Sequence, residues 1–158
     1  MKRKLLLVIS MLLIVCCLTA CSDNKRFNEI TGLNIDKLKL VDEYDSHGGF
    51  QGDGISYFKY DVKEDNILAD IEKDGRYHKF PLEKAALEML YDNPYIVDEN
   101  QKALMPEVNN GYYLIIDRHS DAHEGQDNME IFERYSLNYT IVVYDSDNQY
   151  LYICEQDT

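Results

Sequence analysis

The amino-terminal segment most constrains this chain, because it has the layout of an export signal. Residues 2–4 are all basic, and an apolar run broken only by Ser10 continues to Leu18. The apolar stretch over residues 5–20 would reach about 24 Å as a helix at about 1.5 Å per residue. That length is short of a hydrocarbon core of about 30 Å. We therefore interpret residues 1–20 as a cleaved secretory signal peptide rather than as a permanent membrane span.

The signal segment ends in Leu-Thr-Ala-Cys at residues 18–21, and this motif resembles the lipobox of bacterial lipoproteins. The resemblance implies that the Cys21 sulfur receives a diacylglyceryl group and that cleavage occurs between Ala20 and Cys21. Two acyl chains hold a protein stably on a membrane, whereas one chain binds only marginally. The alternative is ordinary signal cleavage beside an incidental cysteine, since Cys16 and Cys17 also occur nearby. We expect a protein anchored in the cell membrane on its extracytoplasmic face.

The rest of the chain has the length of one domain. Residues 21–26 form the modified cysteine and a short polar spacer, and residues 27–158 form a single domain. Loss of residues 1–20 removes three basic residues and no acid, so the formal net charge changes from −13 to −16. So acidic a domain does not bind nucleic acid or an anionic bilayer through its charge. Cys154 is the one cysteine inside this domain, so we expect a core without a disulfide.

Hydrophobic patterning in the domain predicts an α+β fold. Alternating or continuous apolar residues predict strands at residues 38–45, 55–62, 112–117, 139–144 and 149–154. Apolar stripes at helical spacing predict helices at residues 64–74 and 81–91. Residues 129–135 fit a helical turn and an edge strand equally well. The order of these elements predicts a mainly antiparallel sheet of about five strands with two helices packed on one face.

A loop rich in glycine joins the first two predicted strands. Residues 47–54 contain four of the chain's eight glycines. Phosphate-binding loops use glycine so that backbone N–H groups can close on an anion, but such loops precede a helix, and here a strand follows. Phe50 lies at the tip, flanked by His47 and Asp53. We interpret this group either as a recognition loop or as a wide turn whose aromatic ring folds back onto the core.

A second polar cluster begins where the third predicted strand ends, at Asp117, Arg118 and His119. His119 and His123 are four residues apart, which on a helix would direct both toward one metal ion, but the segment is loop-like and lacks HExxH. Convergence of His47, His119 and an aspartate would suit zinc. Solvent-facing loop residues are one alternative. A buried pair between Arg118 and an aspartate that shapes the loop is another.

The domain is also similar to a set of small lipoproteins of low-GC Gram-positive bacteria. The shared stretches are HGGF-x-GDG at residues 47–54 and GYY…DRHS at residues 111–113 and 117–120. The resemblance extends over most of residues 31–158 and implies a family and a location, but no reaction. Gln51 stands where this set often has histidine, and that departure weighs against catalysis.

Together these features predict a lipid-anchored extracytoplasmic domain that binds a protein, a peptide or a small molecule at the cell surface. No cofactor motif is found, and we assign no catalytic or metal-ligating residue. The candidate binding residues come from the two polar loops: His47, Phe50, Asp53, Asp117, Arg118 and His119. The alternative is a metal-dependent hydrolase that uses the loop at His47 together with residues 117–119. That alternative requires the two loops to meet.

Overall fold

The structure, a computed structural model, describes residues 24–48, 52–92, 96–119 and 136–158. The predicted signal peptide, Cys21, Phe50 and the segment 129–135 lie outside the described residues. The chain divides into two compact units, Met1–Lys37 and Leu38–Thr158. Within the described ranges, no helix has both the length and the apolar character needed to cross a membrane.

The first unit contains a helix over residues 24–31 and a 3-10 turn at Ile35–Lys37. Gly32, with φ at 74°, ends the helix in the left-handed conformation that favours glycine. Its N–H donates to the carbonyl of Asn28. The Asn28 amide donates to Asp36, and its side-chain oxygen accepts from the Ile35 N–H. These bonds fix the turn that follows the helix.

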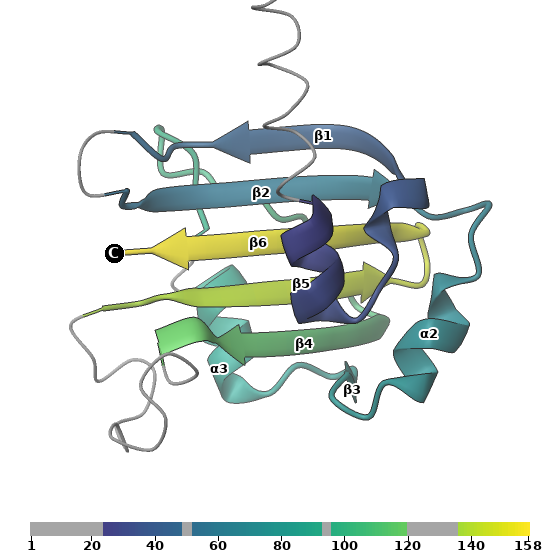
Figure 1. Ribbon diagram of the computed structural model, residues 1–158. Coiled ribbons are helices and arrows are strands. Elements are labelled where there is room, and N and C mark those ends of the chain that lie inside the picture. Colours follow the sequence, from purple (N-terminus) through teal and green to yellow (C-terminus); the bar gives the residue numbers. More distant parts are fainter. Residues whose placement is uncertain (1–23, 49–51, 93–95, 120–135) are drawn as a thin grey trace, which may run out of the picture. The chain divides into compact units, whose positions relative to one another are not determined.

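In the described part of the second unit, six strands form one antiparallel sheet (Figure 1). In sheet order they are β1 (Lys39–Asp45), β2 (Gly54–Asp61), β6 (Tyr150–Asp157), β5 (Tyr139–Asp145), β4 (Gly111–Asp117) and β3 (His78–Lys79). Every residue of β5 is buried, and so is most of β6. Both lie in the middle of the sheet, which explains their nearly continuous apolar sequences. The α+β class and the antiparallel sheet agree with the sequence prediction.

The strands differ from the prediction at two places. All five predicted strands are present, but β3 is an additional one. It pairs only His78 with Tyr113 and Lys79 with Tyr112, and two residues give no periodic pattern to detect. In addition, β6 continues past its predicted end to Asp157, because Gly54 of β2 pairs with this last residue.

The helices are shorter than predicted and do not share a face of the sheet. The predicted pair corresponds to α2 (Ile67–Lys73) and to α3 (Lys84–Leu87), which continues as a π-helical turn, η2 (Glu88–Asp92). In Figure 1, α3 lies behind the sheet and α2 lies beside the strand ends. Glu72 of α2 accepts a hydrogen bond from Tyr112, whose side chain leaves β4 on the face opposite to Tyr113. The predicted arrangement of two helices on one face is therefore corrected.

The main core lies between the sheet and the segment formed by α3, η2 and the loop after them. Its buried strand residues are Tyr57, Tyr113, Tyr139, Ile141, Val143, Tyr152 and Cys154. The covering segment contributes Ala86, Met89, Leu90, Ile96, Met105 and Val108. Complete burial raises the pKa of the Cys154 thiol. Cys154 is therefore a small apolar core residue rather than a nucleophile.

Candidate functional site

His47 follows β1 and is held between two carboxylates. Its Nδ1 lies 2.7 Å from Oδ1 of Asp45, and its Nε2 lies 3.1 Å from Oδ2 of Asp157. The His47 backbone N–H also donates to the same Asp45 oxygen at 2.8 Å, a local turn typical of aspartate. Asp45 ends β1 and Asp157 ends β6, and β2 lies between these strands. One imidazole therefore joins two strand ends that are not neighbours in the sheet.

The start of β2 makes room for the His47 ring. A Cβ atom on Gly54 would lie 2.7 Å from the His47 Cα and 2.8 Å from its Cγ. Only glycine permits so close an approach. Two residues further along β2, the Ser56 hydroxyl lies 3.1 Å from Nδ1 of His47. At least one glycine of the 47–54 loop is thus explained by packing against the histidine.

Arg118 reaches the same carboxylate from the segment after β4. Its Nη1 donates to Oδ1 of Asp157 at 2.7 Å. Its Nη2 donates to the backbone carbonyls of Tyr139 and Gln156, each at 3.0 Å. The guanidinium therefore ties the start of β5 to the end of β6. We call the group of His47, Asp45, Asp157 and Arg118 the His47–Arg118 junction.

A buried carboxylate extends the junction into the sheet. Glu155 of β6 is only 2% exposed, and its Oε1 lies 3.8 Å from Nε of Arg118. The same oxygen accepts a hydrogen bond from the Thr140 hydroxyl at 2.7 Å. Glu155 pairs with Thr140 on one side and with Ser56 on the other, so polar side chains form a row across three strands. A carboxylate at such depth needs partners of this kind.

The contacts of the junction favour the charged forms of His47 and Asp45. Burial alone would lower the pKa of His47, but the hydrogen bonds and charges of Asp45 and Asp157 outweigh it and raise that pKa above its ordinary value. For Asp45, burial acts to raise the pKa, yet the contacts from His47 and Ser56 hold it below its ordinary value. The cations and carboxylates of the junction therefore offset each other.

The structure brings two of the predicted site residues together, His47 and Arg118, with Asp157 between them. The two loops therefore meet at this point. Asp53 is exposed and takes no part in the contacts of the junction given above. Asp117 lines a separate pocket, and the backbone N–H of His119 donates to the Asn138 carbonyl at 3.3 Å. Phe50 is outside the described residues.

One alternative from the sequence, a pair between Arg118 and an aspartate, is present as Arg118 and Asp157, but the sequence did not identify which carboxylates form the junction. Asp45 stands two residues before His47, so an Asp-x-His turn was available as a local signal. Asp157 is 110 residues from His47 in sequence, and it follows the predicted end of its strand. Nothing local connects the two. Glu155 was missed because an acidic residue near the end of a strand ordinarily faces solvent.

The junction gives little room for a metal ion. Among residues 24–48, 52–92, 96–119 and 136–158, no three His, Cys, Asp or Glu side chains are grouped to hold a metal. A metal-binding histidine offers the lone pair of a neutral ring nitrogen. Both ring nitrogens of His47 are instead engaged by carboxylates that favour the protonated ring. This geometry lends no support to the hydrolase alternative.

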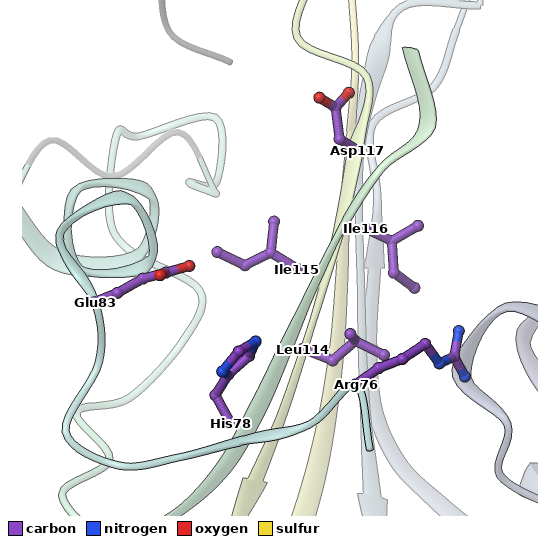
Figure 2. A pocket seen from close by; sticks show the side chains of 7 residues that line it. All are labelled: Arg76, His78, Glu83, Leu114, Ile115, Ile116 and Asp117. Atoms are coloured by element: carbon purple, nitrogen blue, oxygen red, sulfur yellow. The ribbon is translucent and has the colours of Figure 1, made fainter. Parts of the chain in front are cut away.

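A pocket of about 510 Å³ lies beside the outer edge of β4 (Figure 2). It is lined by Leu114–Asp117 of β4 and by Arg76, His78 and Glu83. Figure 2 shows His78, Glu83 and Ile115 on one side of β4, and Arg76, Leu114 and Ile116 on the other. The pocket therefore straddles the edge of the sheet.

Neighbouring contacts position the lining of this pocket. The His78 ring stacks on Tyr113, with ring centroids 5.5 Å apart. The backbone N–H of Glu83 donates to the Tyr113 hydroxyl at 3.2 Å, which places the Glu83 side chain at the pocket. Arg76 is bound to Asp74, with Nη2 to Oδ2 at 2.6 Å, and these contacts hold the pKa of Asp74 below its ordinary value.

Comparisons of this chain with known proteins identified no similar protein. No family model matches the chain, and neither does any curated protein or solved structure. What the chain does is therefore inferred from its own residues. Its described parts contain a closed polar junction at the strand ends and an open pocket at the β4 edge.

Proposed function

We propose that this chain is a lipoprotein anchored on the extracytoplasmic face of the cell membrane, whose folded domain binds a ligand rather than catalysing a reaction. The Leu-Thr-Ala-Cys motif behind a basic and apolar leader supports the anchor at Cys21. The strongly acidic composition supports a partner other than nucleic acid or an anionic bilayer. The ligand is a protein, a peptide or a small molecule at the cell surface.

We favour binding over catalysis because both ring nitrogens of His47 already have hydrogen-bond partners. A general acid or base must come within hydrogen-bond reach of its substrate. In this domain both ring nitrogens of His47 are bonded to carboxylates, and the Nη atoms of Arg118 are bonded to Asp157 and to two carbonyls. These groups stabilise strand ends. The pocket beside β4 is a part of the described structure that is open to a ligand.

The first prediction concerns the anchor. The full chain is expressed in a bacterial host that is fed a palmitate analogue. We expect the analogue to be incorporated into the protein. The Cys21→Ala substitution should abolish this incorporation and should release the protein from the membrane fraction. Cys17→Ala is the matched control, because it also removes a cysteine but lies within the segment that is cleaved. Label that persists in Cys21→Ala, or is absent from the unaltered chain, would contradict lipidation at this residue.

A further inference from the structure

We propose that the outer edge of β4 binds an extended peptide as an added strand, and that this peptide carries a basic side chain next to apolar ones. This inference deepens the proposed binding function and rests on it. It starts from the pairing of β4, which is seven residues long but, among the described residues, pairs on its outer side only with the two-residue β3. Past Tyr113, no strand of the described residues continues along this edge.

The backbone of Ile115 faces this open edge. In an antiparallel pair, alternate residues exchange N–H and C=O groups with the same neighbour. The Phe80 N–H donates to the Gly111 carbonyl at 3.1 Å, so Gly111 and Tyr113 turn their backbone groups toward β3. By the same alternation Ile115 turns its N–H and C=O outward, where β3 has already ended. An extended chain laid beside β4 would satisfy both groups, which is the basis of recognition by strand addition.

The pocket has the position and extent that an added strand requires. Its lining includes the four consecutive β4 residues Leu114–Asp117. At about 3.3 Å per residue these present about 13 Å of edge, enough for three or four peptide residues. Side chains of an added strand would alternate between the two sides of β4 seen in Figure 2. One set would meet Ile115, His78 and Glu83, and the other set would lie over Ile116.

The charged residues of the pocket indicate which side chains a bound peptide would carry. The carboxylate of Glu83 lies at the pocket, and Asp117 adds a second acidic residue at the end of β4. The guanidinium of Arg76, which also lines the pocket, is paired with Asp74 at 2.6 Å. A lysine or arginine of the peptide therefore suits the Glu83 side, and an apolar residue suits Ile116. The net charge of −13 also steers a basic peptide toward the chain and disfavours a second copy as the occupant.

The test uses the full chain in detergent micelles and a fluorescent six-residue probe that alternates valine and lysine. Fluorescence anisotropy should show binding that weakens about tenfold or more when the alternate set of probe backbone nitrogens that faces β4 is methylated, because edge hydrogen bonds are lost, and binding that changes little when the other set is methylated. A probe that alternates valine and glutamate should bind at least about tenfold more weakly. Equal binding of the methylated probes would overturn strand addition, and equal binding of the glutamate probe would overturn the charge preference.

Protein variants and amide exchange locate the site. Glu83→Lys should weaken binding of the lysine probe about tenfold, whereas Glu64→Lys, an exposed residue away from the pocket, should leave it unchanged. By NMR, a saturating probe should slow exchange of the Ile115 amide and leave that of Leu114, which faces β5, unchanged. An Ile115 amide that is protected without probe in a dimeric chain would overturn the proposal. If no probe binds, the peptide inference fails, and the palmitate experiment still decides the anchor separately.

Discussion

At the scale of single residues, His47 shows how one side chain sets the requirements of its neighbours. It needs a glycine at position 54, a hydroxyl at Ser56 and a carboxylate on each side of the ring. Its side chain is 23% exposed, so these contacts are partly shielded from water. Charge-assisted hydrogen bonds in such places are stronger than those between neutral groups.

Gly54→Ala tests the close approach to His47. The new methyl group would meet the His47 Cα and N at 2.7 Å, so the backbone must shift, and we expect a loss of about 1–3 kcal/mol in the free energy of unfolding. Gly75→Ala is the control, because a Cβ there meets nothing within 4 Å. Urea denaturation of both variants measures the difference. Similar stabilities for the two would show that the approach is not restrictive.

The protonation of His47 gives a dependence on pH with a definite sign. Its pKa is raised by folding from an ordinary value of 6.5, so its contribution is complete below about 6.5 and is lost as pH rises through the folded pKa. The pKa of Asp45 is lowered from 3.8, so its contribution is complete above that value and is lost as pH falls through the folded pKa. The junction is therefore most stabilising between about pH 4 and 6.5.

We predict that His47→Gln destabilises the chain most at about pH 5–6, by about 1–3 kcal/mol, and less as pH rises toward 9. Denaturation curves of the unaltered chain and the variant at a series of pH values give this difference directly. A loss of the same size at every pH would mean that the ring acts through its shape and not through its charge.

At the scale of elements, the junction ties together strand ends that are not adjacent. His47 joins the end of β1 to the end of β6, and Arg118 joins the segment after β4 to β5 and β6. Replacement of one partner of a buried ion pair is costly because the other charge is left uncompensated. In this case Glu155, at 2% exposed, would lose the guanidinium that lies 3.8 Å from its carboxylate.

Arg118→Gln should therefore lower the free energy of unfolding by about 2–4 kcal/mol, somewhat less than for a fully buried pair, because Arg118 is 23% exposed. The matched control is Lys84→Gln, which removes a cation from an exposed pair with Glu88 and should change stability by less than about 0.5 kcal/mol. Urea denaturation measures both effects. Equal losses of stability for the two substitutions would contradict a structural role for Arg118.

The elements also show how far sequence patterns extend. The alternation in β2 and the apolar runs of β4 and β5 predict those strands directly, because side-chain period and burial decide them. The end of β6 is not predictable in this way. Glu155 and Asp157 look like a polar tail, and only pairing with β2 and β5 makes them part of a strand.

The candidate site was predictable to the same partial degree. The polar loops that contain His47 and Arg118 stand out from their residue types, and both residues enter the junction. Their common partner Asp157 was not predictable, because its position depends on the order of strands in the sheet. Asp117 is adjacent to Arg118 in sequence, yet it lines the pocket and not the junction.

At the scale of the whole molecule, the net charge bears on how the protein would be held at a membrane. A formal net charge of −13, or −16 after the predicted cleavage, repels an anionic membrane surface. This charge is consistent with our proposal that attachment comes from acyl chains on Cys21 rather than from the folded domain. A domain held in this way has its acidic surface available to basic partners, in keeping with the peptide proposed for the β4 edge.

The central claim, a binding domain with a structural His47–Arg118 junction, is tested most directly by a thermal melt of the full chain with EDTA and then with zinc, manganese, calcium or magnesium. A metal at 100 times its dissociation constant would stabilise the chain by about 2.7 kcal/mol, a shift of several degrees for a domain of this size. We predict no shift with any metal. A shift of several degrees that His119→Ala or His47→Ala abolishes would contradict the account and favour a metal-dependent hydrolase.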